Sequence, residues 1–449
     1  MTKERRLTTS RAGRLSQLGR LAGSLAGGAI AEGARQLASG KRPSIGDMLL
    51  TPGNAHRLGE RLSEMRGAAM KVGQLLSMDD GHILPPQLSQ ILARLREDAH
   101  SMPLGQVAQV LEREWGDHWQ TRFKRFHFTP IAAASIGQVH QAILSDGQRV
   151  AIKVQYPGVR DSIDSDVDNV ATLLRLSRML PEGLDLGPLL NEAKQQLHIE
   201  ADYRQEADAL DRYRELVGDD TRFELPGVFD ELTSQATLTM QFLDGQPIES
   251  LREASPEQRN ATGGALLELA LREVFHWGTV QTDPNFANFR YAADTRRIQL
   301  LDFGATRDYP PHTVAGLQQL LAASLDGSDS DVLRAAARIG YIALDDPEAY
   351  QRSIVVLLRM VTEPIHGGED YAFGTSDLAQ RITDQVLQMR TRERFTRLPP
   401  PPVLFLHRKL GGLYLLLSTL RARVPVAELA QRLIAPEPPQ VPQTANPTA

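Results

Sequence analysis

The chain has 449 residues, of which 41% are hydrophobic and 23% are charged, and this globular composition excludes intrinsic disorder over the whole length. It contains no cysteine, which excludes disulfides, zinc–thiolate sites, iron–sulfur clusters and cysteine nucleophiles. The formal net charge of −5 gives no support to a nucleic-acid partner, because such proteins carry a basic excess or a basic stripe.

Residues 1–43 form a basic, glycine-rich segment with five arginines in its first twenty positions. Gly19, Gly23 and Gly27 follow at a spacing of four, which in lipid lets two helix backbones approach closely. The segment is typical of a membrane-surface anchor or an organelle presequence, and the alternative is the frayed start of a helix. The chain has no uninterrupted apolar run of about 18 residues, which argues against a conventional transmembrane helix.

Residues 44–128 are predicted to form a helical extension. Apolar residues recur at helical spacing in Leu62–Leu76, and shorter helical patterns follow in Leu88–Arg96 and Leu104–Trp115. The pair Pro85-Pro86 ends the first of these patterns, since proline interrupts a helix. The predicted helical extension thus comes before the first predicted strand, which begins at Ile136.

A β-rich unit is predicted over residues 129–243. Ile136–Leu144 and Arg149–Tyr156 have the pattern of two strands, and Asp146-Gly147 between them predicts a tight hairpin turn. The other elements expected in this unit are helices at 159–180 and 189–216 and a strand at 236–243.

Residues 244–435 are predicted to form a mainly helical unit, with short strands near 289–291 and 298–301. The end of the chain, residues 436–449, is rich in Pro, Gln and Thr and is predicted to be disordered. The order is thus a helical extension, a small β-rich unit and a larger helical unit.

Three motifs in the correct order predict the chemistry of a kinase. Val150-Ala151-Ile152-Lys153 lies on the second hairpin strand, where the lysine of a kinase holds the α- and β-phosphates of ATP. Asp283 precedes Asn288 by five positions, as in a kinase catalytic loop, where the Asp accepts or orients a hydroxyl proton and the Asn binds a metal ion. Asp302 opens an Asp-Phe-Gly motif, whose carboxylate binds Mg²⁺. Together they predict ATP or ADP with Mg²⁺ as cofactors, Lys153 and Asp283 as catalytic residues, and Asn288 and Asp302 as metal ligands.

Several parts depart from an ordinary protein kinase. Ala132-Ala133-Ala134-Ser135 replaces the Gly-rich loop, and alanine methyl groups restrict the approach of backbone amides to phosphate. Gln281-Thr282 replaces the His-Arg of the catalytic loop, and no Ala-Pro-Glu motif follows Asp302. Residues 305–311 are too few for a peptide-docking activation loop. We expect nucleotide binding with impaired transfer to a bulky acceptor.

The sequence resembles the UbiB/AarF-type atypical kinases, the family that includes the mitochondrial coenzyme-Q-supporting ATPases, over roughly residues 15–435. The stretches that carry this likeness are Lys71-Val72-Gly73-Gln74, residues 132–140, Glu200-Ala201-Asp202-Tyr203 with Glu206, residues 282–285 with Asp302, and residues 405–414. The resemblance implies an α+β, protein-kinase-like bilobal fold. Its small lobe contains the β-sheet, its large lobe is mainly helical, and an N-terminal helical extension covers the active site.

The resemblance also implies roles for individual residues of the small lobe. Lys153 would bind phosphate and pair with Glu206, and Lys71 would act over the same site as a further catalytic lysine. Met240 and Leu243, at the end of the last predicted strand, would form the hinge where backbone groups meet adenine. Ala132, Ala133, Ala134 and Ser135 would contact the nucleotide.

The same resemblance places Lys71 and Gln74 over the nucleotide pocket, with Lys71 held by Glu200 and Asp202. Helical spacing restricts this arrangement, because Asp202 and Glu206 are four apart and share one helix face while Glu200 points away from both. One regular helix cannot direct all three carboxylates at one lysine. At least two partners are therefore expected for them.

The resemblance implies that the protein binds and hydrolyses ATP. This activity would support the biosynthesis of ubiquinone or another isoprenoid quinone, or lipid homeostasis. The implied partners are a membrane surface, isoprenoid lipids or quinone intermediates, and quinone-biosynthesis enzymes, and a homodimer stays open. The implied location is cytoplasmic and peripheral to a membrane, or alternatively the matrix face of the mitochondrial inner membrane. An authentic protein or small-molecule kinase and a catalytically silent lipid-binding scaffold are the competing functions. The four intact motif residues argue against the silent scaffold.

Overall fold

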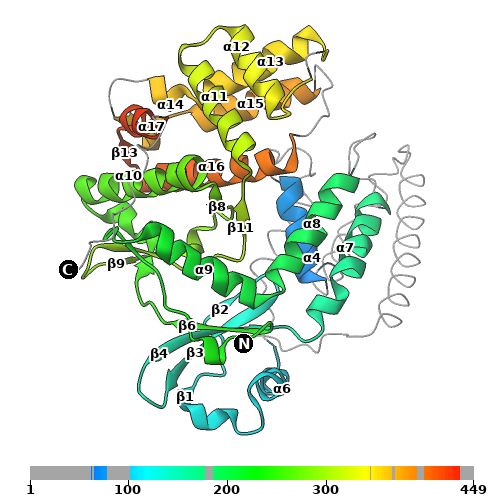
Figure 1. Ribbon diagram of the computed structural model, residues 1–449, viewed down its shortest axis with the longest axis vertical. Coiled ribbons are helices and arrows are strands. Elements are labelled where there is room, and N and C mark those ends of the chain that lie inside the picture. Colours follow the sequence, from blue (N-terminus) through cyan, green and yellow to red (C-terminus); the bar gives the residue numbers. More distant parts are fainter. Residues whose placement is uncertain are drawn as a thin grey trace, which may run out of the picture. The chain divides into compact units, whose positions relative to one another are not determined.

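The computed structural model describes residues 62, 65–77, 102–176, 186–343, 345–366, 370–391 and 399–434. The chain divides into two compact units, shown with their elements in Figure 1. The first unit contains the residues up to Gly245 together with Gln299–Ala305, and the second contains Gln246–Ile298 together with the residues from Thr306 onward. The predictions for residues 1–43, 88–96 and 436–449 lie outside the described residues.

The first unit is built on a five-stranded antiparallel sheet in which β1, β3, β4 and β6 follow one another and β2 pairs with β3. Its strands are β1 (Phe123–Phe126), β2 (Ala132–Ala133), β3 (Gly137–Leu144), β4 (Arg149–Gln155) and β6 (Thr237–Gln241). The predicted hairpin is confirmed, because β3 and β4 pair in register from Gly137↔Gln155 to Ile143↔Arg149. Gly147 in its turn has a φ of 96°, which glycine adopts without steric cost.

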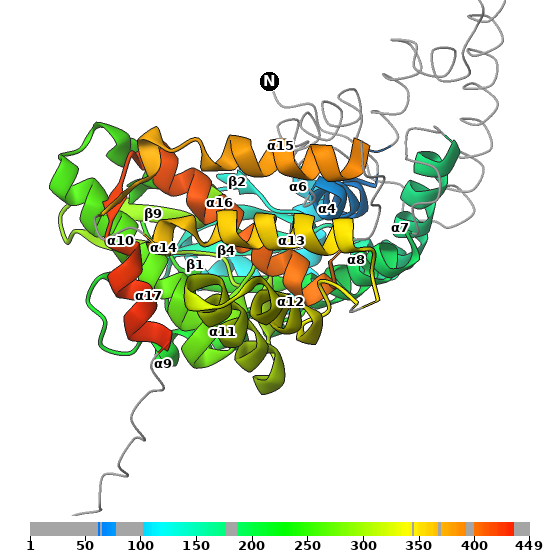
Figure 2. The same cartoon turned by 90° about the horizontal axis from the view of Figure 1, so that it is seen from above.

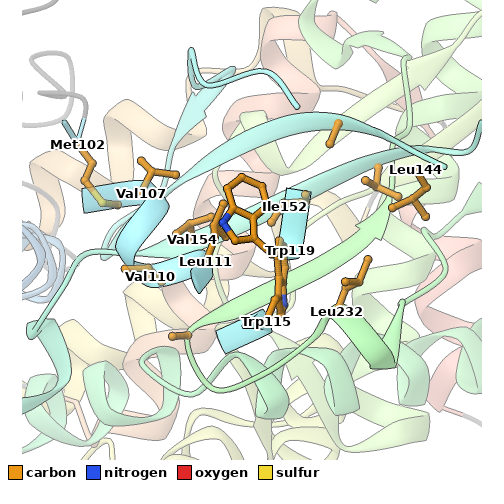
Figure 3. Close-up of a cluster of buried hydrophobic side chains, with 13 residues drawn as sticks. Met102, Val107, Val110, Leu111, Trp115, Trp119, Leu144, Ile152, Val154 and Leu232 are labelled. Carbon is orange, nitrogen blue, oxygen red and sulfur yellow. The ribbon is translucent and has the colours of Figure 1, made fainter. Parts of the chain in front are cut away.

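One core of the first unit lies between this sheet and α6 (Leu104–Trp115), as Figure 3 shows. Leu111 and Trp119 are almost fully buried against Ile152 of β4. The prediction that residues 44–128 are helical to their end is wrong at Phe123–Phe126, which form β1. The reason is tertiary, since the rings of this strand pack against Trp119, with 5.3 Å between the ring centroids of Trp119 and Phe126.

Four further helices lie among the described residues of the first unit. They are α4 (Arg66–Ser77), α7 (Val159–Leu176), α8 (Gly187–Glu200) and α9 (Tyr203–Val217). Helix α4 packs against α7 and α8, and Figure 2 shows the three lying together. A continuous helix over 189–216 was predicted, and this prediction is wrong because α8 ends at Glu200 and α9 begins at Tyr203. Asp202 caps α9, its side chain accepting a hydrogen bond from the Arg204 N–H.

The second unit is mainly helical, as predicted. Its helices are α10 (Pro256–Arg272), α11 (Pro311–Asp326), α12 (Asp329–Arg338), α13 (Glu348–Val361), α14 (Glu363–His366), α15 (Leu378–Thr391), α16 (Pro401–Leu420) and α17 (Val426–Ile434). Three short antiparallel pairs lie among its described residues: β7 (Gln246–Pro247) with β9 (Phe289–Ala292), β8 (Thr279–Gln281) with β11 (Thr306–Asp308), and β12 (Tyr371–Ala372) with β13 (Arg423–Val424). The other short strands that the structure describes are β5 (Phe223–Glu224) and β10 (Arg297–Leu300).

Helix α16 is long and apolar enough, over Pro402–Leu420, to cross a membrane by length and composition alone. Half of that stretch is nevertheless buried within the protein. The helix packs against α10, and Lys409 makes a buried ion pair with Glu273 at 2.8 Å. These contacts attach the helix to the rest of the second unit.

Candidate functional site

Lys153 on β4 lies at the centre of a charged cluster in the first unit. Its Nζ donates hydrogen bonds to Oε1 of Glu206 on α9 and, at 2.9 Å, to Oδ2 of Asp302, which follows β10. The side chains of Lys153 and Glu206 are 6% and 7% exposed, whereas that of Asp302 is 35% exposed. The predicted Lys153–Glu206 pair is therefore present, and Asp302 is the member of the cluster that a ligand can reach.

Burial and charge act in opposite directions on the three groups of this cluster. Burial alone would lower the pKa of Lys153, but the carboxylates of Asp302 and Glu206 outweigh it and raise that pKa, so the lysine stays protonated. Burial opposes the charged form of Asp302, yet Lys153 and the Gly304 N–H, 3.1 Å from Oδ1, hold its pKa below the ordinary value. Burial raises the pKa of Glu206 to about 7, against the effect of Lys153. The cluster thus keeps a cation and an accessible anion side by side.

Lys71 on α4 forms a second lysine–glutamate pair in the first unit. Its Nζ donates to Oε1 of Glu200, and the side chains of the two residues are 6% and 10% exposed. The other carboxylate oxygen of Glu200 accepts a hydrogen bond of 3.0 Å from Oγ of Ser135. Glu200 therefore links α4 to the alanine-rich loop. Gly67 makes the close approach possible, because a Cβ there would lie 3.3 Å from the Ser135 carbonyl oxygen.

Asp202 does not take part in this second pair, so the prediction that it helps to hold Lys71 is wrong. Its carboxylate instead caps α9 and accepts a hydrogen bond of 3.3 Å from Nε2 of Gln235, and it lies 3.9 Å from Nη2 of Arg160. The break between α8 and α9 turns Glu200 and Glu206 toward different lysines. The expectation of at least two partners for the three carboxylates is confirmed.

The alanine-rich loop is a tight hairpin. Ala132 and Ala133 pair with Val139 and Gln138 of β3, and the Ala134 N–H donates to the Gly137 carbonyl at 2.9 Å. This hairpin stands at the end of the sheet where a kinase has its Gly-rich loop. Gln74 lies half-buried on α4, three positions from Lys71, and its place over a nucleotide stays a prediction.

The proposed hinge lies at the end of β6. Met240 is buried and pairs with Ala151 of β4, and the Phe242 N–H donates to the Arg149 carbonyl at 3.0 Å. The side chain of Leu243 is also buried. Within the described part of the chain, no protein group hydrogen-bonds the N–H or C=O of Leu243. With respect to the described residues, the Leu243 backbone is thus open to the hydrogen bonds by which a hinge recognises adenine.

Asp283 and Asn288 lie together in the second unit, after β8. The Asn288 amide donates to Oδ2 of Asp283 at 3.1 Å and to the Asp283 carbonyl at 3.3 Å. Asn285 supports the turn between them, since its side chain accepts a hydrogen bond from the Ala287 N–H. Arg408 of α16 donates to Oδ1 of Asp283. Arg408 lies in the stretch 405–414 that carries the family resemblance, but the sequence gave it no role, because nothing in local spacing connects residues so far apart in the chain.

The described residues fit a magnesium ion that is shared with a nucleotide. Mg²⁺ is usually held by one or two carboxylates together with water and substrate phosphates. Among the described residues, no group of three or more His, Cys, Asp or Glu side chains gathers to hold a metal ion by itself. The partly exposed Asp302 carboxylate, fixed by Lys153 and the Gly304 N–H, has the donor chemistry that such a shared ion requires.

Comparison with known proteins identifies the family. Residues 94–336 match the model of the ABC1 atypical kinase-like domain. The chain is 38% identical to the mitochondrial atypical kinase COQ8B of Danio rerio, over 94% of this chain and 68% of the relative. It is 37% identical to the mitochondrial atypical kinase COQ8 of Saccharomyces cerevisiae, over 96% of this chain and 86% of the relative.

Among solved structures, Rv3197 of Mycobacterium tuberculosis in complex with erythromycin is similar at a TM-score of 0.58. It is 28% identical, and the likeness covers 85% of this chain and 96% of that one. The family match and the mixed architecture confirm both the stated resemblance and the predicted α+β, protein-kinase-like fold. The chain therefore belongs to the ABC1, or UbiB-type, family of atypical kinases.

Proposed function

We propose that this atypical kinase binds ATP or ADP with Mg²⁺ and hydrolyses ATP in support of ubiquinone or other isoprenoid-quinone biosynthesis at a membrane. The observation that carries the proposal is the cluster of Lys153, Glu206 and Asp302 in the first unit. In kinases the lysine at this position contacts the phosphates of ATP, and the aspartate of the Asp-Phe-Gly motif binds Mg²⁺.

Each residue of the cluster has a separate task in nucleotide binding. Glu206 fixes the Lys153 ammonium, which would contact the α- and β-phosphates. Asp302 would hold Mg²⁺, and Asn288 is proposed as the second ligand from its five-residue spacing to Asp283. When bound, the ion supplies charge neutralisation for the phosphate oxygens. The Leu243 backbone, which no described residue hydrogen-bonds, supports the hinge role, in which adenine is recognised by main-chain hydrogen bonds.

Hydrolysis is proposed rather than protein phosphorylation because the features that receive a peptide are reduced or covered. Glu200 ties α4, through Lys71, to Ser135 of the alanine-rich loop, so the extension is fastened where a kinase loop normally moves freely. After Asp302 the chain forms only β11 before α11 begins at Pro311. The chain is thus too short here for a peptide-docking segment.

The biological role rests on the family. The relatives in zebrafish and yeast are named as mitochondrial atypical kinases, and the family includes proteins that support coenzyme Q. We accordingly propose an isoprenoid lipid or quinone intermediate and quinone-biosynthesis enzymes as partners, with a homodimer as a further proposal. The proposed location is the surface of a membrane, either from the cytoplasm or from the mitochondrial matrix.

The direct test is ADP release by the full chain with Mg²⁺, with and without liposomes and phenolic quinone head-group analogues. The proposal expects Mg²⁺-dependent release that liposomes or phenols stimulate, and that Asp302→Asn abolishes. If ADP release is stimulated only by added proteins, and those proteins become labelled with phosphate, the result would instead support a protein kinase. Absence of both nucleotide binding and release would support a silent scaffold.

A further inference from the structure

We infer that Arg408 is a positioning residue for Asp283, and that α16 serves as a brace for the catalytic loop, here Gln281–Asn288. The inference rests on the proposed function, because it concerns how Asp283 is held for its part in ATP hydrolysis. In an ordinary kinase the catalytic loop carries His-Arg directly before the Asp. Here those positions are Gln281 and Thr282, and the cation that binds the Asp283 carboxylate comes from α16, far along the chain.

The two oxygens of the Asp283 carboxylate are bound by different partners. Arg408 Nη2 donates to Oδ1, and Asn288 Nδ2 donates to Oδ2 at 3.1 Å. With both oxygens bound, the carboxylate cannot rotate without breaking a charge-assisted hydrogen bond. A carboxylate offers about four lone-pair positions, so positions are left for a water molecule or hydroxyl. The arrangement therefore fixes the direction of the acid without using up its capacity to accept.

The pair between Arg408 and Asp283 is largely shielded from solvent. The side chains of Arg408 and Asp283 are 14% and 23% exposed. In the Arg432–Glu268 pair of the same unit, by contrast, the arginine side chain is 54% exposed and the glutamate side chain 18%. Exposed ion pairs contribute little, because water screens the charges and the long side chains lose entropy. The planar guanidinium of Arg408 is suited to hold a carboxylate in one orientation, which a lysine ammonium does less well.

Helix α16 also contacts the loop on the residue that follows Asp283. A Cβ at Gly412 would lie 2.3 Å from Cβ of Pro284, so the helix and the loop touch at a distance that only glycine permits. Arg408 and Gly412 are four positions apart and therefore lie on one face of the helix. One helix face thus holds both the carboxylate of Asp283 and the ring of Pro284.

The same helix is itself anchored in the second unit. Lys409 makes an ion pair with Glu273 at 2.8 Å, and the two side chains are 6% and 1% exposed. His407 is hydrogen-bonded to the hydroxyl of Tyr341. A guanidinium carried by a helix with these contacts has a fixed position, which is what a positioning residue needs.

The test is a double-mutant cycle in ATP hydrolysis with wild type, Arg408→Gln, Asp283→Asn and the combined variant. We expect Arg408→Gln to lower kcat by about 10- to 100-fold, as misplacement of a catalytic group does, with the affinity for Mg-ADP unchanged. In the Asp283→Asn background the same change should have no further effect, because Arg408 acts through that carboxylate. Arg408→Lys should restore part of kcat.

Arg432→Gln is the matched control, since it removes an arginine and its ion pair with Glu268 from the same unit without touching the partner of Arg408. Its kcat should equal that of wild type. The inference is overturned if Arg408→Gln keeps the wild-type kcat. It is also overturned if the two losses multiply in the combined variant, or if Arg408→Gln weakens Mg-ADP binding at unchanged kcat, which would make Arg408 a nucleotide ligand.

The failure of the proposed function would have a different signature. In that case wild type itself releases no ADP. The contact between Arg408 and Asp283 is then tested by urea unfolding of the same four proteins. If the midpoint of the combined variant shifts by less than the sum of the two single shifts, the two side chains are coupled. That result would support Arg408 as the group that holds Asp283. Additive shifts would overturn that contact as well.

Discussion

Lys153 in the first unit and Asp283 in the second both come from kinase motifs, yet they are held in different ways. Lys153 is buried between two carboxylates, Asp302 of the Asp-Phe-Gly motif and Glu206 of α9. Asp283 is partly exposed and is held by Asn288 of its own motif and by Arg408 of a late helix. The nucleotide-binding cluster is thus assembled from residues to which the sequence already gave these roles, whereas the catalytic loop depends on a residue of α16 to which the sequence gave no role.

The largest effect is expected from Asp302→Asn, which removes the accessible charge of the first cluster. Without this carboxylate the metal loses its protein ligand in the first unit, and we expect Mg²⁺-dependent nucleotide affinity to fall by about 100-fold, as for the loss of charge-assisted contacts. A thermal-shift titration with Mg-ATP measures this. A mutant that is stabilised as strongly as wild type would refute the metal assignment.

A large effect on stability is expected from Glu200→Gln, which leaves the Lys71 ammonium buried without its anionic partner. Loss of one member of a buried pair costs about 3–5 kcal/mol. Ser135→Ala removes only one neutral donor from the same carboxylate and should cost about 1 kcal/mol. Urea unfolding, followed by tryptophan fluorescence, compares the unfolding free energies of the two variants. The control is the double variant Glu200→Gln with Lys71→Met. If that combination is no more stable than Glu200→Gln alone, the Lys71–Glu200 link is not what fastens α4.

A pH effect is expected in the second unit from His407. Burial lowers its pKa to about 4, whereas the unfolded chain has the ordinary value of about 6.5. The folded state therefore binds the proton less readily, and stability is lost as pH falls from about 6.5 toward 4, by up to about 3 kcal/mol. His407→Gln retains an acceptor for the Tyr341 hydroxyl and removes the titration. Its unfolding free energy should vary less with pH than that of wild type, and parallel curves would exclude His407 as the source.

The smallest effect is expected from Ala134→Gly in the alanine-rich loop. Ala134 is half-buried, and its N–H already bonds the Gly137 carbonyl, so the fold should be retained. The added backbone freedom allows a closer approach to phosphate, and we expect changed ATP and ADP affinities or raised autophosphorylation, with only about 1 kcal/mol lost in stability. Radiolabel incorporation and nucleotide titrations measure these effects. Unchanged values in both would show that the alanine methyl group does not restrain the nucleotide.

Local pattern was sufficient to predict much of the fold. The Asp-Gly turn predicted the hairpin of β3 and β4, and helical periodicity predicted α6 at its observed limits, Leu104–Trp115. The break between α8 and α9 was missed because Glu200-Ala201-Asp202 contains neither glycine nor proline. A signal was present, since Asp202 followed by Gln205 is a capping pattern at the start of a helix.

The candidate site was predictable in one unit and not fully in the other. Motif order gave Lys153 and Asp302, and the family resemblance gave Glu206 as the partner of Lys153. Strand β1 and the Arg408–Asp283 contact depend on packing between segments far apart in sequence, which no local pattern contains. The assignment of Asp202 to Lys71 failed for the same reason, because the direction of its side chain is set by the helix break.

The measurement that tests the central claim most directly is the fate of the γ-phosphate of labelled ATP, with Mg²⁺, liposomes and a mixture of added proteins. Hydrolysis at the cluster of Lys153, Glu206 and Asp302 predicts inorganic phosphate in equal amount to ADP, with none formed by Asp302→Asn. Label transferred mainly to the added proteins, at a rate that matches ADP formation, would contradict this account.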